Sequence, residues 1–162
     1  MHTVQSRIDY KKVAPKALQA MFVLEEYSRG SGLEPELLEL VRLRASQING
    51  CAYCVDMHTK DARANGETEQ RLYAVAVWRE APFFSERERA ALVWTEAVTL
   101  ISQNQVPENI YEIARSQFSE RELIDLTMAV IAINGWNRLA VSFRAVAGDY
   151  QPSVPHGAAR ER

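Results

Sequence analysis

The stretch ELLELVRLRASQINGCAYCVDMHTKDARA, residues 36–64, decides the class of fold. Its apolar residues recur at three- and four-residue spacing, which is typical of amphipathic α-helices and unlike the alternating pattern of strands. Asn49 and Gly50 interrupt this pattern, as turn residues between helices do. The stretch therefore predicts two consecutive helices, at residues 36–48 and 51–64.

The same periodicity continues on both sides of this stretch, and no alternating run is long enough to build a sheet. Pro15 stands in the first turn of a helix expected at residues 14–30. Ser85 with Glu88, and Ser119 with Glu122, form capping boxes that mark two further helix starts. The other helices are expected at residues 68–80, 89–101, 108–118, 123–133 and 136–147. We therefore predict an all-α protein of seven or eight helices.

The length of 162 residues fits one domain, which we place at residues 1–148. Residues 149–162 contain prolines and charges without an apolar period, which predicts an extended or loose C-terminal tail. The segment at residues 123–133 is apolar at nine of its eleven positions. A helix with so little polar surface is either central in the fold or part of a subunit interface.

The overall composition excludes several classes of protein. Apolar residues make up 47% of the chain, charged residues make up 25%, and the net charge is -2. This charge creates no field that would gather nucleic acid or an anionic membrane, so we expect neither as a partner. No secretory signal or membrane span is visible, and a cytoplasmic location is the default expectation.

The two cysteines, Cys51 and Cys54, are separated by only two residues. A disulfide between them would close a very short loop and stabilise the fold little. At 100° per helical residue, both cysteines and His58 lie on one stripe of the predicted helix. The spacing therefore favours a chemical role over a structural one.

Two features of this helix favour a reactive thiolate, and they favour different cysteines. Asn49 is a candidate N-cap that would place Cys51 in the first turn, where the helix dipole stabilises an anion. His58 lies four residues after Cys54 and is close enough to accept its thiol proton. Either cysteine could therefore attack first, and the other would then close a disulfide.

A CxxC pattern also occurs in metal and haem sites, which this sequence fits less well. A structural zinc site needs about four ligands, and the chain has no second CxxC; zinc completed by Glu39 or water remains an alternative. A c-type haem site would need a histidine where Val55 stands, and a thioredoxin-like site would need strands around it. The remaining alternative is that both cysteines are small residues of the core and His58 is a satisfied polar group.

The stretch ELVRLRASQINGCAYCVDMH, residues 39–58, resembles the core motif of the AhpD-like alkyl hydroperoxidases in the carboxymuconolactone decarboxylase superfamily. That motif is a glutamate, a CxxC twelve residues later and a histidine four residues after the second cysteine. Glu39, Cys51, Cys54 and His58 occupy these positions. The similarity extends more weakly from RIDYKKVAPKAL near the N-terminus to INGWNRLAV at residues 133–141.

The resemblance implies an all-helical domain with the CxxC at the start of a central helix, assembled into a homo-oligomer such as a trimer or hexamer. It also implies that Glu39 and His58 deprotonate Cys54 through a water, that Cys54 attacks the peroxide, and that Cys51 resolves the product. The chain departs from better-studied members at Tyr53, where they have a second histidine. Decarboxylases of the superfamily lack the cysteine pair, which argues against lactone decarboxylation.

We therefore expect a thiol-dependent peroxidase that needs no metal and no cofactor, and whose partners are a peroxide and an external thiol or disulfide reductant. Two alternatives stay open: a dithiol-disulfide relay with little peroxidase activity, and a non-enzymatic oligomer that responds to redox state or zinc. Without the other motif residues, Glu39 would be interpreted as a solvated charge or a member of an ion pair. Candidate walls for an apolar substrate pocket are Trp78, Trp94, Trp136, Phe83 and Phe84.

Overall fold

The computed structural model describes residues 5–152, and over this range it contains α-helices, one 3-10 helix and no strand. The predicted all-α class is therefore confirmed, with the CxxC at the start of a helix. The helices are α1 (Tyr10–Val13), α2 (Pro15–Arg29), α3 (Pro35–Ile48), α4 (Ala52–Ala64), α5 (Glu69–Ala74), η1 (Val75–Val77), α6 (Glu86–Thr99), α7 (Ile101–Asn104), α8 (Glu108–Gln117) and α9 (Glu120–Phe143).

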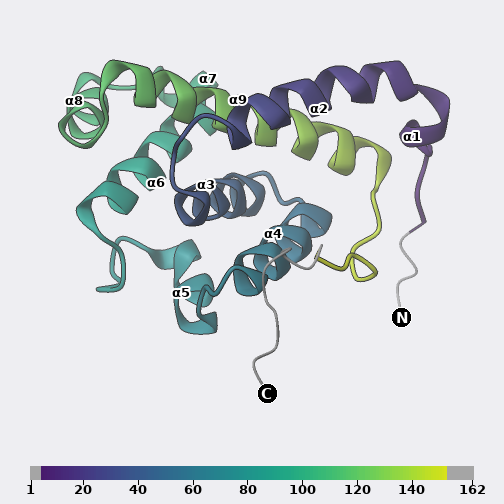
Figure 1. The fold of residues 1–162 in the computed structure, drawn as a ribbon, viewed down its shortest axis with the longest axis horizontal. Coiled ribbons are helices and arrows are strands. Elements are labelled where there is room, and N and C mark those ends of the chain that lie inside the picture. The colour runs from purple at the N-terminus through teal and green to yellow at the C-terminus, as the bar shows by residue number, and fades with distance from the viewer. Residues whose placement is uncertain (1–4, 153–162) are drawn as a thin grey trace.

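Helix α3 is the central helix of the fold because it packs against α4, α6 and α9. Helices α2 and α9 lie side by side along one edge of the molecule, and α4 lies on the opposite side of α3 (Figure 1). The largest cluster of buried apolar residues joins α3, α6, α8 and α9, and it includes Leu37, Val41, Trp94, Leu126 and Val130. This packing fixes α3 and α4, the two helices that carry the motif residues.

Both predicted capping boxes are present. The Ser85 hydroxyl accepts the backbone N–H of Glu88, and the Glu88 carboxylate accepts the N–H of Ser85 at the start of α6. Ser119 and Glu122 make the same exchange at the start of α9. Each box satisfies backbone donors that a helix end leaves without partners.

The two helices expected at residues 123–133 and 136–147 are one continuous helix, α9. Gly135 does not interrupt it, and a Cβ atom there would come within 2.7 Å of Met21 Cε on α2. Gly135 therefore lies inside the helix, where the end of the Met21 side chain packs against it, and does not mark a helix end. Helix α9 ends at Phe143, before Arg144 adopts a left-handed conformation with φ 53°.

Helix α9 occupies a central position and still has an outward face. Leu126, Val130 and Ile133 are buried in the core, whereas Ile124 and Ile131 are exposed. The central role of the apolar segment is thus seen directly, and its role in a subunit interface stays a prediction.

Smaller differences concern short elements. The single helix expected at residues 68–80 is divided into α5 and η1, and the four-residue helices α1 and α7 were not predicted. Of the predicted tail, residues 149–152 are described and residues 153–162 lie outside the described part. No helix in the described range combines the length and apolarity that a membrane crossing requires.

Candidate active site

The CxxC motif begins at the N-terminus of α4. Cys51 is the N-cap, and its Sγ accepts the backbone N–H of Cys54 at 3.2 Å. The predicted N-cap, Asn49, is instead the C-cap of α3. Gly50, with φ +66°, lies between the two helices and redirects the chain, so the extended conformation that a cap requires falls on Cys51.

The structure contains the cysteines as a disulfide, with Cα atoms 5.3 Å apart. Cys51, Cys54 and His58 are only 2%, 1% and 3% exposed, so all three turn toward the interior as their shared stripe predicted. Ala140 of α9 belongs to the same buried cluster as the two cysteines. The small alanine allows α9 to pass close to the sulfur atoms.

His58 of α4 is held by Glu39 of α3. Its Nδ1 lies 2.8 Å from Oε2 of Glu39, and the glutamate is 7% exposed. Burial alone would raise the pKa of Glu39, but the hydrogen bond and charge of His58 and the charge of Arg42 outweigh it, and the pKa lies below its usual value. An ionised Glu39 favours the tautomer in which Nδ1–H of His58 is the donor.

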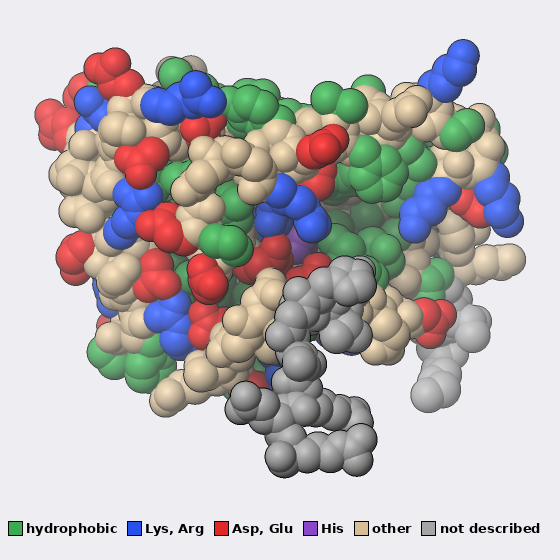
Figure 2. All heavy atoms as spheres, in the orientation of Figure 1, with side chains coloured by type: hydrophobic (Ala, Val, Ile, Leu, Met, Phe, Trp, Pro, Cys, Tyr) green, Lys and Arg blue, Asp and Glu red, His purple; other side chains and the backbone are tan. Residues whose placement is uncertain are grey.

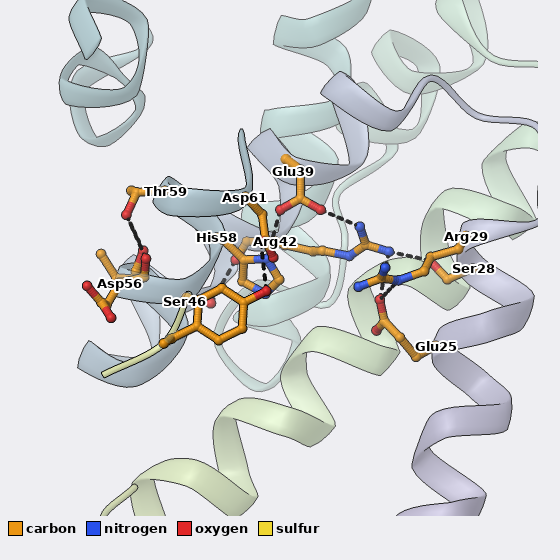
Figure 3. A network of polar contacts seen from close by, with 12 residues as sticks. Glu25, Ser28, Arg29, Glu39, Arg42, Ser46, Asp56, His58, Thr59 and Asp61 are labelled. Carbon is orange, nitrogen blue, oxygen red and sulfur yellow. Dashed lines mark hydrogen bonds and ion pairs between the residues drawn. The ribbon is translucent and has the colours of Figure 1, made fainter. Parts of the chain in front are cut away.

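Arg42 connects this pair to α2. Its Nη1 lies 2.7 Å from Glu39 Oε1, and its Nη2 lies 2.9 Å from Glu25 Oε1 and 3.4 Å from Ser28 Oγ (Figure 3). Both carboxylates around this buried guanidinium therefore have a partner. The three-residue spacing of Glu39 and Arg42 was visible in the sequence, whereas the contact with α2 depends on tertiary packing.

The second nitrogen of His58, Nε2, is buried and has no hydrogen-bond partner among the described residues. With Nδ1 donating to Glu39, Nε2 carries the free lone pair and can accept a proton. His58 and Cys54 both line a cavity of about 210 Å³. In Figure 2 a histidine side chain is visible in a hollow beside hydrophobic side chains.

The cavity is lined mostly by apolar and aromatic side chains from α1, α2, α4 and α9. Of the five aromatic residues proposed as its walls, only Trp136 lines it; Trp78, Trp94 and Phe84 are buried in the core, and Phe83 lies elsewhere on the surface. Three further aromatic walls were not predicted, because they come from three different helices that only the fold brings together. The full lining is Tyr10, Lys11, Phe22, Glu25, Arg29, Tyr53, Cys54, Met57, His58, Trp136 and Ala140.

The turn before Cys51 is fixed by asparagines of α9. Asn49 Nδ2 donates to Oδ1 of Asn137 at 2.8 Å and to Oδ1 of Asn134 at 3.0 Å. Asn137 Nδ2 donates in turn to Ser46 Oγ at 3.0 Å, and Asn137 is 1% exposed. The INGWN segment of the sequence thus aligns the end of α3, and with it the first cysteine.

Asp61 is a further acidic group beside the Glu39–His58 pair. Ligand atoms of Asp61, Glu39 and His58 all lie within 4.8 Å of one another. Yet Glu39 already contacts Arg42 and His58, and Oδ1 of Asp61 accepts the hydroxyl of Tyr150 at 2.7 Å. These contacts describe a hydrogen-bonded cluster, and the absence of a metal requirement stays a prediction.

Comparison with known proteins gives a consistent assignment. The model of the "Carboxymuconolactone decarboxylase family" matches residues 15–97. The uncharacterized protein YdfG of Bacillus subtilis is 40% identical over 139 residues, which are 86% of this chain and 95% of YdfG.

Among solved structures, a protein of unknown function from Agrobacterium tumefaciens, provisionally described as the antioxidant defence protein AhpD, is 46% identical. It superposes with a TM-score of 0.88 and covers 90% of this chain and 100% of its own. The debrominase Bmp8 is 18% identical, with a TM-score of 0.77 over 85% of this chain and 74% of its own, and shares the fold alone. The chain, with an AhpD-like fold and CxxC motif, belongs to the carboxymuconolactone decarboxylase family.

Proposed function

We propose that the protein is a thiol-dependent peroxidase that reduces hydrogen peroxide or small organic hydroperoxides. The observation that carries the proposal is that Cys54 and His58 line the same cavity, and that Nε2 of this histidine has no hydrogen-bond partner among the described residues. A thiol, a base and space for a substrate therefore meet at one point. Cys51 does not line the cavity, which supports Cys54 as the attacking residue and Cys51 as the resolving one.

In the first step, the reduced Cys54 gives its proton to Nε2 of His58, directly or through a water. Glu39 stabilises the resulting imidazolium through Nδ1. The thiolate then attacks one peroxide oxygen, so an S–O bond forms while the O–O bond breaks. The leaving alkoxide takes the proton from His58 and departs as an alcohol, and Cys54 becomes a sulfenic acid.

In the second step, the Cys51 sulfur attacks the sulfenic sulfur of Cys54. An S–S bond forms, the S–O bond breaks, and the departing hydroxide takes the Cys51 thiol proton and leaves as water. The Cys51–Cys54 disulfide is then opened by an external dithiol or an equivalent reductant, which supplies two electrons and two protons. A reducing compartment such as the cytoplasm provides reductants of this kind.

The cavity supports a small substrate. Its volume of about 210 Å³ lies below the range of drug-sized pockets, and apolar side chains such as Phe22, Met57 and Trp136 line it. Such walls favour the carbon chain of a compact organic hydroperoxide, while the peroxide group lies toward Cys54 and His58. No step of this cycle requires a metal or a bound cofactor.

A single-turnover experiment tests the proposal. The fully reduced protein is mixed with one equivalent of hydroperoxide, and peroxide loss and protein mass are followed together. We expect the wild type to lose two hydrogens as the disulfide forms. Cys51→Ser should consume one equivalent and stop at an oxidised Cys54, whereas Cys54→Ser should consume almost none. Full peroxide consumption by Cys54→Ser would exclude the proposal.

The same experiment addresses the alternative of a dithiol-disulfide relay. Rapid reduction of a small disulfide without peroxide consumption would assign the relay in place of the peroxidase. Zinc bound at about one ion per chain, with loss of assembly on chelation, would instead assign the non-enzymatic role. Since the debrominase shares this fold, a halogenated aromatic compound belongs in the substrate panel as a third test.

A further inference from the structure

The first residues after α9 return to the active site and lie against α4. Lys60 Nζ donates to the backbone oxygens of Gly148 and Tyr150, each at 3.0 Å. The backbone N–H of Gly148 donates to Asp56 Oδ2 at 3.2 Å. These bonds place Tyr150 so that its hydroxyl donates to Asp61 Oδ1 at 2.7 Å.

The surroundings of Tyr150 keep its hydroxyl protonated, so that it remains the donor in this contact. Its burial, together with the hydrogen bond to Asp61 and the negative charge of that carboxylate, raises the pKa of Tyr150 well above its usual value. The phenol therefore stays protonated and continues to neutralise part of the charge on Asp61.

Asp61 is a half-buried carboxylate that the peroxidase mechanism does not use. Its oxygen lies within 4.8 Å of ligand atoms of His58 and Glu39. Solvent and salt screen charges that are this close and partly buried much less than they screen charges on the surface. The hydrogen bond from Tyr150 withdraws part of the negative charge of the Asp61 carboxylate. It therefore determines how strongly Asp61 acts on His58 and Glu39.

We propose that Asp61, held by Tyr150, is a positioning residue that sets the pH at which the Cys54–His58 pair loses its proton. The inference rests on the proposed function, since it concerns the same thiol and the same base. It assigns a role to the segment after α9 that lies outside the CxxC motif. Asp61 itself touches neither the cavity nor the sulfur atoms.

The charge environment of His58 determines the sign of the effect. Glu39 and Arg42 come from α3, Glu25 and Arg29 from α2, and Asp61 from α4, while the protonatable groups around the cavity are Tyr10, Lys11, Tyr53 and Cys54. Glu39 and Glu25 are both paired with Arg42, and Arg29 is paired with Glu25. Asp61 instead has the neutral hydroxyl of Tyr150 as its hydrogen-bond partner, and its charge also interacts with that of Arg29.

Removing a negative charge disfavours the imidazolium of His58 and stabilises a nearby thiolate. Asp61→Asn should therefore move the acid limb of thiolate formation to lower pH, by about one unit. Tyr150→Phe leaves the carboxylate without its donor and should cause a smaller shift to higher pH. Two variants that merely lost packing would not be expected to shift the pH of thiolate formation in opposite directions.

The test measures the rate of alkylation of the reduced protein by iodoacetamide as a function of pH, because this rate reports the Cys54 thiolate without any peroxide. Alkylation is scored at Cys54 by mass spectrometry in a Cys51→Ser background. The matched control is Asp56→Asn, which removes the same charge from the same helix, while its amide oxygen can still accept the N–H of Gly148 and so keep the returning segment in place. In Figure 3, Asp56 points away from His58 and Glu39.

We expect Asp56→Asn to leave the midpoint of the alkylation profile unchanged. If Asp61→Asn leaves the midpoint within about 0.2 units of the wild type, or moves it in the same direction as Tyr150→Phe, the inference is overturned. A shifted alkylation profile in a protein that consumes no peroxide would support the role of Asp61 and count against the peroxidase. The two failures are therefore distinguishable.

Discussion

Glu39 contacts two buried partners at once, so a change at this residue disturbs both of them. One carboxylate oxygen contacts Arg42 and the other contacts Nδ1 of His58. In Glu39→Gln the amide offers one oxygen for these two donors, so His58 loses its anionic support. We expect the rate of Cys54 oxidation by peroxide at pH 7 to fall about 100-fold in stopped-flow measurements.

The control for this variant lies on the same helix. Glu36 is exposed, and Glu36→Gln should leave the oxidation rate within twofold of the wild type. Arg42 keeps its contact with Glu25 in Glu39→Gln, so the protein should stay folded and the far-ultraviolet circular dichroism should be unchanged. A rate within twofold for Glu39→Gln itself would remove Glu39 from the mechanism.

At the scale of elements, the turn between α3 and α4 depends on a buried asparagine of α9. Asn137 donates to Ser46 and accepts from Asn49, and its replacement removes one hydrogen-bond partner from each of these groups. We expect Asn137→Ala to lower the free energy of unfolding by about 3 kcal/mol, measured by urea denaturation of the oxidised protein. Ser142→Ala, on the exposed face of α9, should change it by less than about 0.5 kcal/mol.

If Asn137→Ala lowers the free energy of unfolding by no more than Ser142→Ala does, the contacts with α9 do not hold the turn. The placement of Cys51 would then not depend on the asparagines of α9. Gly50 and the ends of the two helices alone would determine the turn.

The start of α9 predicts a pH dependence of stability. Hydrogen bonds from the backbone and hydroxyl of Ser119 and from Arg87 lower the pKa of Glu122 to about 2 from its ordinary value of 4.5. A lowered pKa in the folded state means that the stabilisation is complete above pH 4.5 and is lost as the pH falls toward 2. Glu122→Ala should lower the free energy of unfolding at pH 7 by only about 1 kcal/mol, because solvent screens the charge of this partly exposed group.

Urea denaturation at pH 7 and pH 3 tests this expectation. The difference between wild type and Glu122→Ala should shrink at pH 3, whereas Glu120→Ala, which removes a more exposed carboxylate of the same turn, should cost little at either pH. An equal cost of Glu122→Ala at both pH values would mean that the charge of Glu122 contributes nothing.

The same elements show how far the sequence alone can predict this fold. Capping boxes are local, so Ser85 and Ser119 mark true helix starts. The continuity of α9 across Gly135 was not predictable from the local pattern, because a glycine between two apolar segments can also mark a helix end. For the site, helical spacing predicted that Cys51, Cys54 and His58 turn inward together. The contact of Arg42 with Glu25 and that of Asp61 with Tyr150 join residues far apart in the chain and required the structure.

At the scale of the whole molecule, the candidate site is assembled from segments at both ends of the chain. Helices α1 and α2 supply Tyr10 and Phe22 to the cavity, α4 supplies Cys54 and His58, and α9 supplies Trp136. The segment after α9 then returns to α4 through Lys60. The cavity beside Cys54 is therefore lined in part by α2 and α9, the same pair of helices that carries exposed apolar residues.

That pair of helices is where we place the predicted subunit interface. Its outward residues include Val23, Ile124 and Ile131, and an assembly that covers them would remove apolar surface from water. Val23→Glu should therefore shift the protein from an oligomer, expected as a trimer or hexamer, toward the monomer in light-scattering chromatography. Val77→Glu is the matched control, because Val77 is 61% exposed, close to the 64% of Val23, and lies on η1 away from this pair. Equal masses for both variants and the wild type would place the interface elsewhere, and a monomeric wild type would exclude the assembly itself.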